Sequence, residues 1–251
     1  MAQQPVIDDF GIDYTRPVLP QIETLGDRYW DWSHQHLTPS FRRRLAENRP
    51  GSSYPDSFPI FSQRFLEAQT HIRWQQVLGL WGLVVVGLIG LTAWYAPVGL
   101  SRGIGWWLSG FLLWTLVEYI LHRVIFHRKP RNLAERQFHF LAHGIHHKDP
   151  WDPTRLVFPL FGGVIIASVI YLVLALFLPL GPSFLTMSGL LTGYLAYDMG
   201  HLAWHHASLK AGWFRYLQRY HLAHHYKDRD SRFGVSQPLW DWVFRSGDLK
   251  M

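Results

Sequence analysis

Four long apolar runs dominate the pattern of hydrophobic and polar positions, and they contain almost no charged residues. The runs occupy residues 77–96, 104–121, 157–178 and 184–205. Each is close to the roughly 20 residues that a helix needs to cross a bilayer. Four buried helices of a soluble core are a weaker explanation, because a chain of 251 residues offers little else to cover them. The pattern therefore predicts an all-α integral membrane protein with four transmembrane helices.

The Lys and Arg residues predict how these helices are oriented. The linker 97–103 holds one basic residue, Arg102, and the linker 179–183 holds none. All other Lys and Arg residues lie in the N-terminal arm, in the segment 122–156 or after residue 205. By the positive-inside rule, we expect these three regions in the cytoplasm and the two linkers outside. The expected fold is two helical hairpins with a cytoplasmic helical cap.

The polar, Pro-rich residues 1–75 are expected to form an N-terminal arm with interfacial helices, and residues 76–251 a membrane domain. The arm starts without an apolar core, so we expect no cleavable signal peptide. The net charge of +6 fits basic residues that meet anionic head groups, so no nucleic-acid partner is expected. The absence of Cys excludes disulfides, thiolate zinc sites and iron–sulfur clusters held by this chain. A bacterial inner membrane and an endoplasmic reticulum membrane are both compatible with these features.

Histidines are the candidate chemistry, because most of the 15 fall in two windows, 122–147 and 201–225. Each window starts at the cytoplasmic end of an even-numbered run, so the predicted topology brings both to one side of the membrane. Both contain HxxHH, and residues three or four apart share one face of a helix. Neutral imidazole binds zinc, iron, copper and nickel. Ten His are the predicted ligands of two metal ions: His122, His127, His143, His146, His147, His201, His205, His221, His224 and His225.

One of these spacings needs a distorted helix. His122 and His127 lie five residues apart, which is about 140° on an ideal helix, so a helix end or kink must bring them to one ion. The other five His are not expected to be direct ligands: His34, His36, His71, His139 and His206.

Two acidic residues precede the first His of each window. Glu118 lies four residues before His122, and Asp198 lies three residues before His201. Acidic side chains at membrane depth are costly, which favours a functional role. A carboxylate that accepts the far ring N–H of a ligand His fixes its tautomer and raises its basicity. We therefore expect Glu118 and Asp198 to belong to the catalytic site, with exposure at the membrane interface as the alternative.

An all-His site of this kind suits oxygen activation or metal transport. Transport sites lie near the bilayer midplane, whereas these His gather at the expected cytoplasmic end. Zinc has no redox chemistry, so an oxygenase implies iron, even though a purified sample can carry zinc. A lipid chain can reach such a site from the bilayer, so we expect a membrane lipid as substrate. A non-catalytic metal-binding or metal-transport protein is the alternative from another class.

The four His motifs resemble those of the fatty acid hydroxylase superfamily: HxxxxH at 122–127, HxxHH at 143–147, HxxxH at 201–205 and HxxHH at 221–225. Between the motifs, segments such as WTLVEYILHRVIFH (114–127) and GYLAYDMGH (193–201) are similar to the fatty acid 2-hydroxylases of sphingolipid metabolism. The likeness runs from about residue 13 to residue 248. A sterol or carotenoid hydroxylase or desaturase with the same ligands is the sibling alternative.

The resemblance implies a C2 hydroxylation of a long fatty acyl chain, free or in ceramide, at two iron ions with O2. It implies one ion on His122, His127, His143, His147 and His224, and the other on His146, His201, His205, His221 and His225. Many members carry a cytochrome b5 domain with an HPGG-type haem motif, which this sequence does not contain. Electrons are therefore expected from a separate donor, such as cytochrome b5 or ferredoxin with its reductase.

Overall fold

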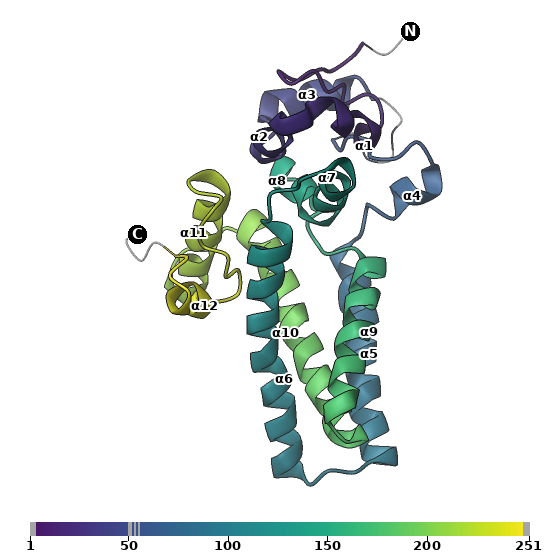
Figure 1. The fold of residues 1–251 in the computed structure, drawn as a ribbon, viewed down its shortest axis with the longest axis vertical. Helices are drawn as coiled ribbons and strands as arrows, with labels where there is room; N and C mark the ends of the chain where they lie inside the picture. Colours follow the sequence, from purple (N-terminus) through teal and green to yellow (C-terminus); the bar gives the residue numbers. More distant parts are fainter. Residues whose placement is uncertain (1–3, 50–51, 53, 55, 248–251) are drawn as a thin grey trace. The chain divides into compact units, whose positions relative to one another are not determined.

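The computed structural model describes residues 4–49, 52, 54 and 56–247. Residue 248, where the resemblance ends, lies outside the described residues. Within them the regular elements are helices, and the only β pairing is one isolated bridge between Ile7 and Asp13, so the all-α prediction is confirmed there (Figure 1). The chain divides into a first unit, Met1–His71 with Arg128–Leu156, and a second unit, Ile72–His127 with Val157–Met251. The boundary expected near residue 75 stays a prediction, and the segment 128–156 groups with the arm.

The first unit consists of short helices around an apolar core that includes Tyr14, Trp32, Phe58 and Phe140. Local sequence explains where some of them begin. Thr38 caps one helix by accepting the backbone N–H of Phe41, and Asn132 caps another in the same way. The elements are α1 (Val18–Gln21), η1 (Ile22–Arg28), α2 (Tyr29–His34), α3 (Pro39–Glu47), α4 (Arg64–Ala68), α7 (Leu133–His139), η3 (Phe140–Gly144) and α8 (Ile145–Lys148).

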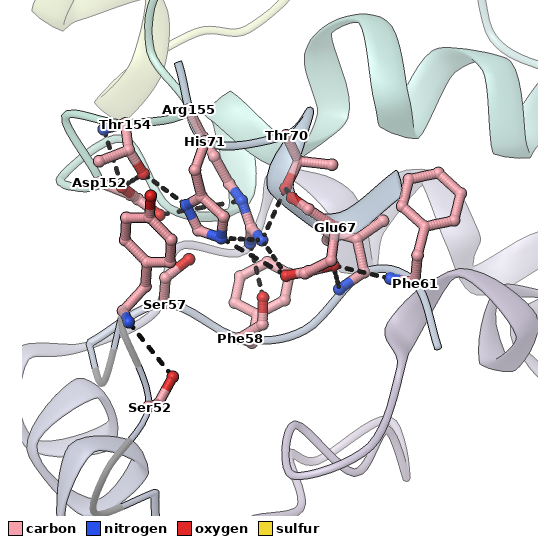
Figure 2. A network of polar contacts seen from close by, with 12 residues as sticks. Ser52, Ser57, Phe58, Phe61, Glu67, Thr70, His71, Asp152, Thr154 and Arg155 are labelled. Carbon is pink, nitrogen blue, oxygen red and sulfur yellow. Dashed lines mark hydrogen bonds and ion pairs between the residues drawn. The ribbon is translucent and has the colours of Figure 1, made fainter. Parts of the chain in front are cut away.

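Two buried cations join the arm to the segment 128–156 within this unit. Lys148 donates to the backbone carbonyl of Trp32 at 3.0 Å and lies 3.7 Å from Asp8. Burial lowers the pKa of Lys148 to about 8, although Asp8 opposes the shift. Arg155 belongs to the polar network drawn in Figure 2, and its guanidinium donates to the backbone carbonyl of Phe58 at 2.6 Å. The arm is therefore attached by buried polar groups as well as by apolar packing.

The second unit contains the long helices. Two short connections, after residues 95 and 177, turn them into an α5–α6 pair and an α9–α10 pair (Figure 1). α10 packs against α5, α6 and α9. The elements are α5 (Trp74–Tyr95), α6 (Leu100–Ile120), η2 (Leu121–Phe126), α9 (Leu160–Phe177), α10 (Leu180–His206), α11 (Gly212–Tyr226) and α12 (Leu239–Val243).

Three helices of the described chain are long and apolar enough to cross a membrane: Trp74–Tyr95, Leu100–Phe126 and Leu160–Phe177. Their outward side chains are strongly exposed, as at Leu83 (75%) and Leu176 (79%), and such faces suit lipid contact. α10 is the fourth apolar run of the sequence but does not reach the same hydropathy. The reason is its role at the centre of the unit, where it buries small and polar residues such as Ser188 and Asp198.

Glycines bring α6 and α10 into backbone contact. A Cβ at Gly110 would overlap the carbonyl oxygen of Thr186, and one at Gly189 would overlap that of Trp107. Small residues at such a crossing are typical of helix pairs in membranes. Further along both helices, Gly193 lies against Trp114. The contacts advance in the same direction on both helices, so α6 and α10 are parallel and their C-terminal ends lie at the same end of the unit.

Candidate metal centre

A π-helical turn brings the first two predicted ligands together. Residues Leu121–Phe126 form η2, in which the His127 N–H donates to the His122 carbonyl at 2.9 Å. This i to i+5 bond widens the turn, so residues five apart come to one side of the helix. The His122 and His127 ring centroids are 4.8 Å apart. The predicted distortion between these two His is therefore confirmed, and it takes the form of a π turn.

His224 of α11 completes a cluster with this pair, which we call the first histidine cluster (His122, His127 and His224). One ligand nitrogen of each lies within 4.8 Å of those of the other two, and all three side chains are buried. The Nε2 atoms of His224 and His127 are 3.1 Å apart. Three imidazoles from the end of α6 and from α11 thus point their nitrogens at one small volume.

A second histidine cluster lies where α10 ends and α11 packs beside it: His201, His205, His221 and His225. His201 and His205, like His221 and His225, are four residues apart and share a helix face. His221 Nε2 lies 2.9 Å from that of His205 and 3.0 Å from that of His225. Burial, and then the neighbouring histidines, lower the pKa of His221 well below its ordinary value. A lowered pKa disfavours the protonated form of this imidazole, and the neutral form is the one that binds metal.

The nitrogen spacings in both clusters test whether a metal ion fits. Metal–imidazole bonds are about 2.1 Å long, so two nitrogens bound at a right angle are about 3.0 Å apart. A tetrahedral pair would be about 3.4 Å apart at the same bond length. The observed 2.9–3.1 Å spacings fit ligands at right angles on one ion. The donor set, neutral imidazole without thiolate, suits iron and other transition metals.

The remaining predicted ligands belong to the first unit. His143 and His147 place their Nε2 atoms 2.9 Å apart across one turn of the η3–α8 segment. His146 is buried on the same short segment. Two histidines that were not expected to bind metal lie close by: the His34 ring is 4.8 Å from that of His147, and His139 Nδ1 is 2.6 Å from the Tyr29 hydroxyl. Sequence spacing could not place His34 here, because it lies more than a hundred residues away.

Backbone carbonyls accept hydrogen bonds from the Nδ1 atoms of two histidines of the first cluster. His122 Nδ1 lies 2.5 Å from the Phe233 carbonyl oxygen, and His224 Nδ1 lies 2.6 Å from that of Ser231. A carbonyl oxygen only accepts hydrogen bonds, so both rings carry their proton on Nδ1. Each Nε2 then keeps a lone pair for a metal ion. These partners could not be predicted, because a backbone carbonyl has no signature in the sequence.

The expected contacts of Glu118 and Asp198 differ from those in the structure. Glu118 accepts the backbone N–H groups of Val235 and Ser236 at 2.7 and 2.8 Å, and the Ser236 hydroxyl. Asp198 accepts the Phe158 N–H and the Tyr194 hydroxyl, each at 3.3 Å. Neither carboxylate accepts a ring N–H of a ligand histidine. The donors to Glu118, and Phe158 as a donor to Asp198, are distant in sequence, whereas Tyr194 lies four residues before Asp198. The catalytic role expected for Glu118 and Asp198 stays a prediction.

A partly open apolar cavity reaches the first cluster from inside the second unit. His122 and Glu118 line one end, and small residues of α9, Gly163 and Ala167, leave room along one side. Its lining on α6 and the start of η2 runs from Trp114 to His122, a rise of about 12 Å for eight residues. Aromatic rings form much of the remaining wall: Trp81, Trp114, Phe126, Phe158, Tyr194 and Tyr197. The cavity suits an extended, apolar chain.

Known proteins share the sequence that carries this centre. A family model described as Fatty acid hydroxylase matches residues 107–246, which include all ten predicted ligands. Dihydroceramide fatty acyl 2-hydroxylase FAH2 of Arabidopsis thaliana is 31% identical over 243 residues, 95% of this chain and 94% of that protein. Fatty acid 2-hydroxylase of Rattus norvegicus is 32% identical over 255 residues, and the match covers 94% of this chain but 64% of the rat protein.

A solved structure described as full-length scs7p, with only its hydroxylase domain visible, has a similar fold. Its TM-score is 0.77 at 31% identity, and the match covers 96% of this chain and 90% of that chain. The likeness therefore extends over both units and is not confined to the His motifs.

Proposed function

Because this chain belongs to the fatty acid hydroxylase family, we propose that it adds a hydroxyl group at C2 of a long fatty acyl chain. It is a hydroxylating oxidoreductase, and the acyl chain is free or part of a ceramide-type lipid. The observation that carries the proposal is the aromatic cavity that ends at His122. An acyl chain in this cavity loses its contact with water, and burial of apolar surface favours binding by about 0.8 kcal/mol per CH₂.

The same premise assigns the ligands. We propose one ion on His122, His127, His143, His147 and His224, and the other on His146, His201, His205, His221 and His225. When bound, two iron ions supply the activation of O2 that an unreactive C–H bond requires. The protein holds the neutral imidazoles in place, and its apolar cavity positions the acyl chain and excludes water. Glu118 and Asp198 act at this site as positioning residues.

The topology and the electron source complete the proposal. α10 is the fourth transmembrane helix, and the basic segments around the histidines lie on the cytoplasmic side, in a bacterial inner membrane or in the endoplasmic reticulum membrane. A separate protein such as cytochrome b5 or ferredoxin with its reductase delivers the two electrons of each turnover. The support is the charge pattern of the sequence and the polar, buried character of α10.

Expression in a host without 2-hydroxylated lipids tests the function. We expect 2-hydroxy acyl species to appear in the lipid extract, detected by mass spectrometry after release of the acyl chains. The His143→Ala variant should abolish the product. The matched control is His206→Ala, which removes an exposed His next to His205. An unsaturated product or a hydroxylated sterol would identify a sibling reaction, and no modified lipid with a reductase supplied would contradict the proposal.

A further inference from the structure

The loop between α11 and α12 carries the carbonyls that hold the first histidine cluster. Phe233 provides the carbonyl for His122, and Ser231 provides the one for His224. Both bonds are short, and the one at His122 is buried, so the position of this loop decides where the two Nε2 lone pairs point. Whatever fixes the loop therefore fixes two ligands of one ion.

Two buried carboxylates bind four consecutive backbone amides of the loop. Asp241 accepts the N–H of Phe233 at 3.0 Å and that of Gly234 at 2.7 Å, and Glu118 accepts those of Val235 and Ser236. Asp241 is fully buried and Glu118 is 3% exposed. A buried carboxylate is costly unless its oxygens accept several hydrogen bonds, and here each has at least two donors.

The contact with Asp241 continues directly to a ligand. The Gly234 N–H and the Phe233 carbonyl belong to one peptide group, so this peptide donates to Asp241 and accepts from His122 Nδ1. The Arg232 N–H, in the same peptide as the Ser231 carbonyl, donates to the Ser246 carbonyl at 2.9 Å. The Ser246 hydroxyl in turn donates to Asp241 at 2.8 Å. Both histidine-binding peptides thus depend on Asp241.

We propose that Asp241 is a positioning residue for the metal ion of the first histidine cluster. It orients the Phe233–Gly234 peptide, and its negative charge polarises this peptide toward His122 because hydrogen bonds in a chain strengthen one another. A carboxylate bonded directly to a ligand histidine fixes the tautomer and the orientation of the ring. Asp241 has the same effect on His122 through the intervening peptide. The inference rests on the metal-binding part of the proposed function and not on the identity of the lipid.

Site-selective metal loss tests the proposal without an activity assay. Asn at position 241 keeps the shape but turns one acceptor into a donor, so one of the two loop amides loses its partner. We expect Asp241→Asn to lower the affinity for one of the two ions per chain by about 10- to 100-fold and to leave the affinity for the other unchanged. Titration of the purified apoprotein with Co²⁺, followed by visible absorption and by elemental analysis, measures both sites. The matched control is Asp230→Asn, which removes an exposed carboxylate on the same loop.

Several outcomes would overturn the proposal. Equal Co²⁺ affinities in Asp241→Asn and the wild type would exclude a positioning role for Asp241. An equal loss of affinity for both ions would contradict it as well, because it would indicate a general structural role. If Asp241→Asn does not fold, Asp241→Glu takes its place in the test because it keeps the negative charge. At the affected site, Asp241→Glu should have a higher Co²⁺ affinity than Asp241→Ala. If the wild-type protein binds both ions but forms no 2-hydroxy lipid, the proposed function is refuted, while a selective loss of metal in Asp241→Asn would still support this inference.

Discussion

Replacement of Arg155 by Met should loosen the first unit in a measurable way. The Arg155 side chain is 2% exposed and lies at the centre of the network in Figure 2. Its guanidinium donates to the Phe58 carbonyl at 2.6 Å, to Glu67 at 2.8 Å, and to Thr70 and His71 at 3.0 Å each. Met fills a similar length of space but donates to none of these acceptors.

The contacts set the size of the effect. Glu67 would stay fixed without its cation, because its second oxygen accepts the N–H groups of Ile60 and Phe61 at 2.8 Å. Removal of one partner from a buried ion pair costs about 3–5 kcal/mol. If the local opening of the unit takes up this loss, the backbone amides of Ile60 and Phe61 should exchange about 100- to 4,000-fold faster. Hydrogen–deuterium exchange with mass spectrometry measures this rate.

A second Arg–Glu pair of the first unit provides the control. Arg131 lies 2.7 Å from Glu135 four residues later, but its side chain is 68% exposed. Exposed pairs contribute little, so Arg131→Met should leave exchange at Ile60 and Phe61 unchanged. If Arg155→Met exchanged within threefold of wild type, or if both variants behaved alike, the network would not stabilise this unit.

Three further predictions concern pH, helix packing and the cavity. Burial alone would raise the pKa of Glu67, but His71, Arg155 and two backbone amides lower it overall, while burial lowers the pKa of His71. Protection of this unit against hydrogen exchange should therefore fall in two steps on acidification. The first lies below about pH 6.5, where His71 gains a proton in the unfolded state, and the second lies below about pH 4.3, where Glu67 does. Hydrogen exchange measured from about pH 8 to about pH 3 tests the direction of both steps. Gly189→Leu should abolish metal binding by separating α6 from α10, whereas Gly87→Leu on the exposed face of α5 should not, as elemental analysis would show. Ala167→Phe should lower kcat/KM for long acyl chains by about tenfold or more with the metal content unchanged, and a normal rate would exclude the cavity as the acyl site.

The sequence predicted the helices and the clustering of the histidines better than it predicted the groups around them. Apolar runs and His spacings are local signals, so the long helices and the distortion between His122 and His127 could be expected from them. The partners of Glu118 could not, because Val235 and Ser236 follow more than a hundred residues later and contribute backbone atoms. The apolar run 184–205 also suggested a more hydrophobic helix than α10 is, because α10 buries polar residues at the centre of the unit.

The parallel arrangement of α6 and α10 explains why two distant His motifs can serve one centre. Gly110 and Gly189 mark the closest backbone approach of these helices. His122 and His201 each follow their glycine by twelve residues, a rise of about 18 Å on a straight helix. The crossing thus sets both histidines at the same height above the glycines. From there the two pairs diverge in local structure: a π turn brings His127 beside His122, whereas ordinary α-helical spacing places His205 beside His201. Helix packing therefore fixes the height of the two clusters, and the local turn decides which side chains face an ion.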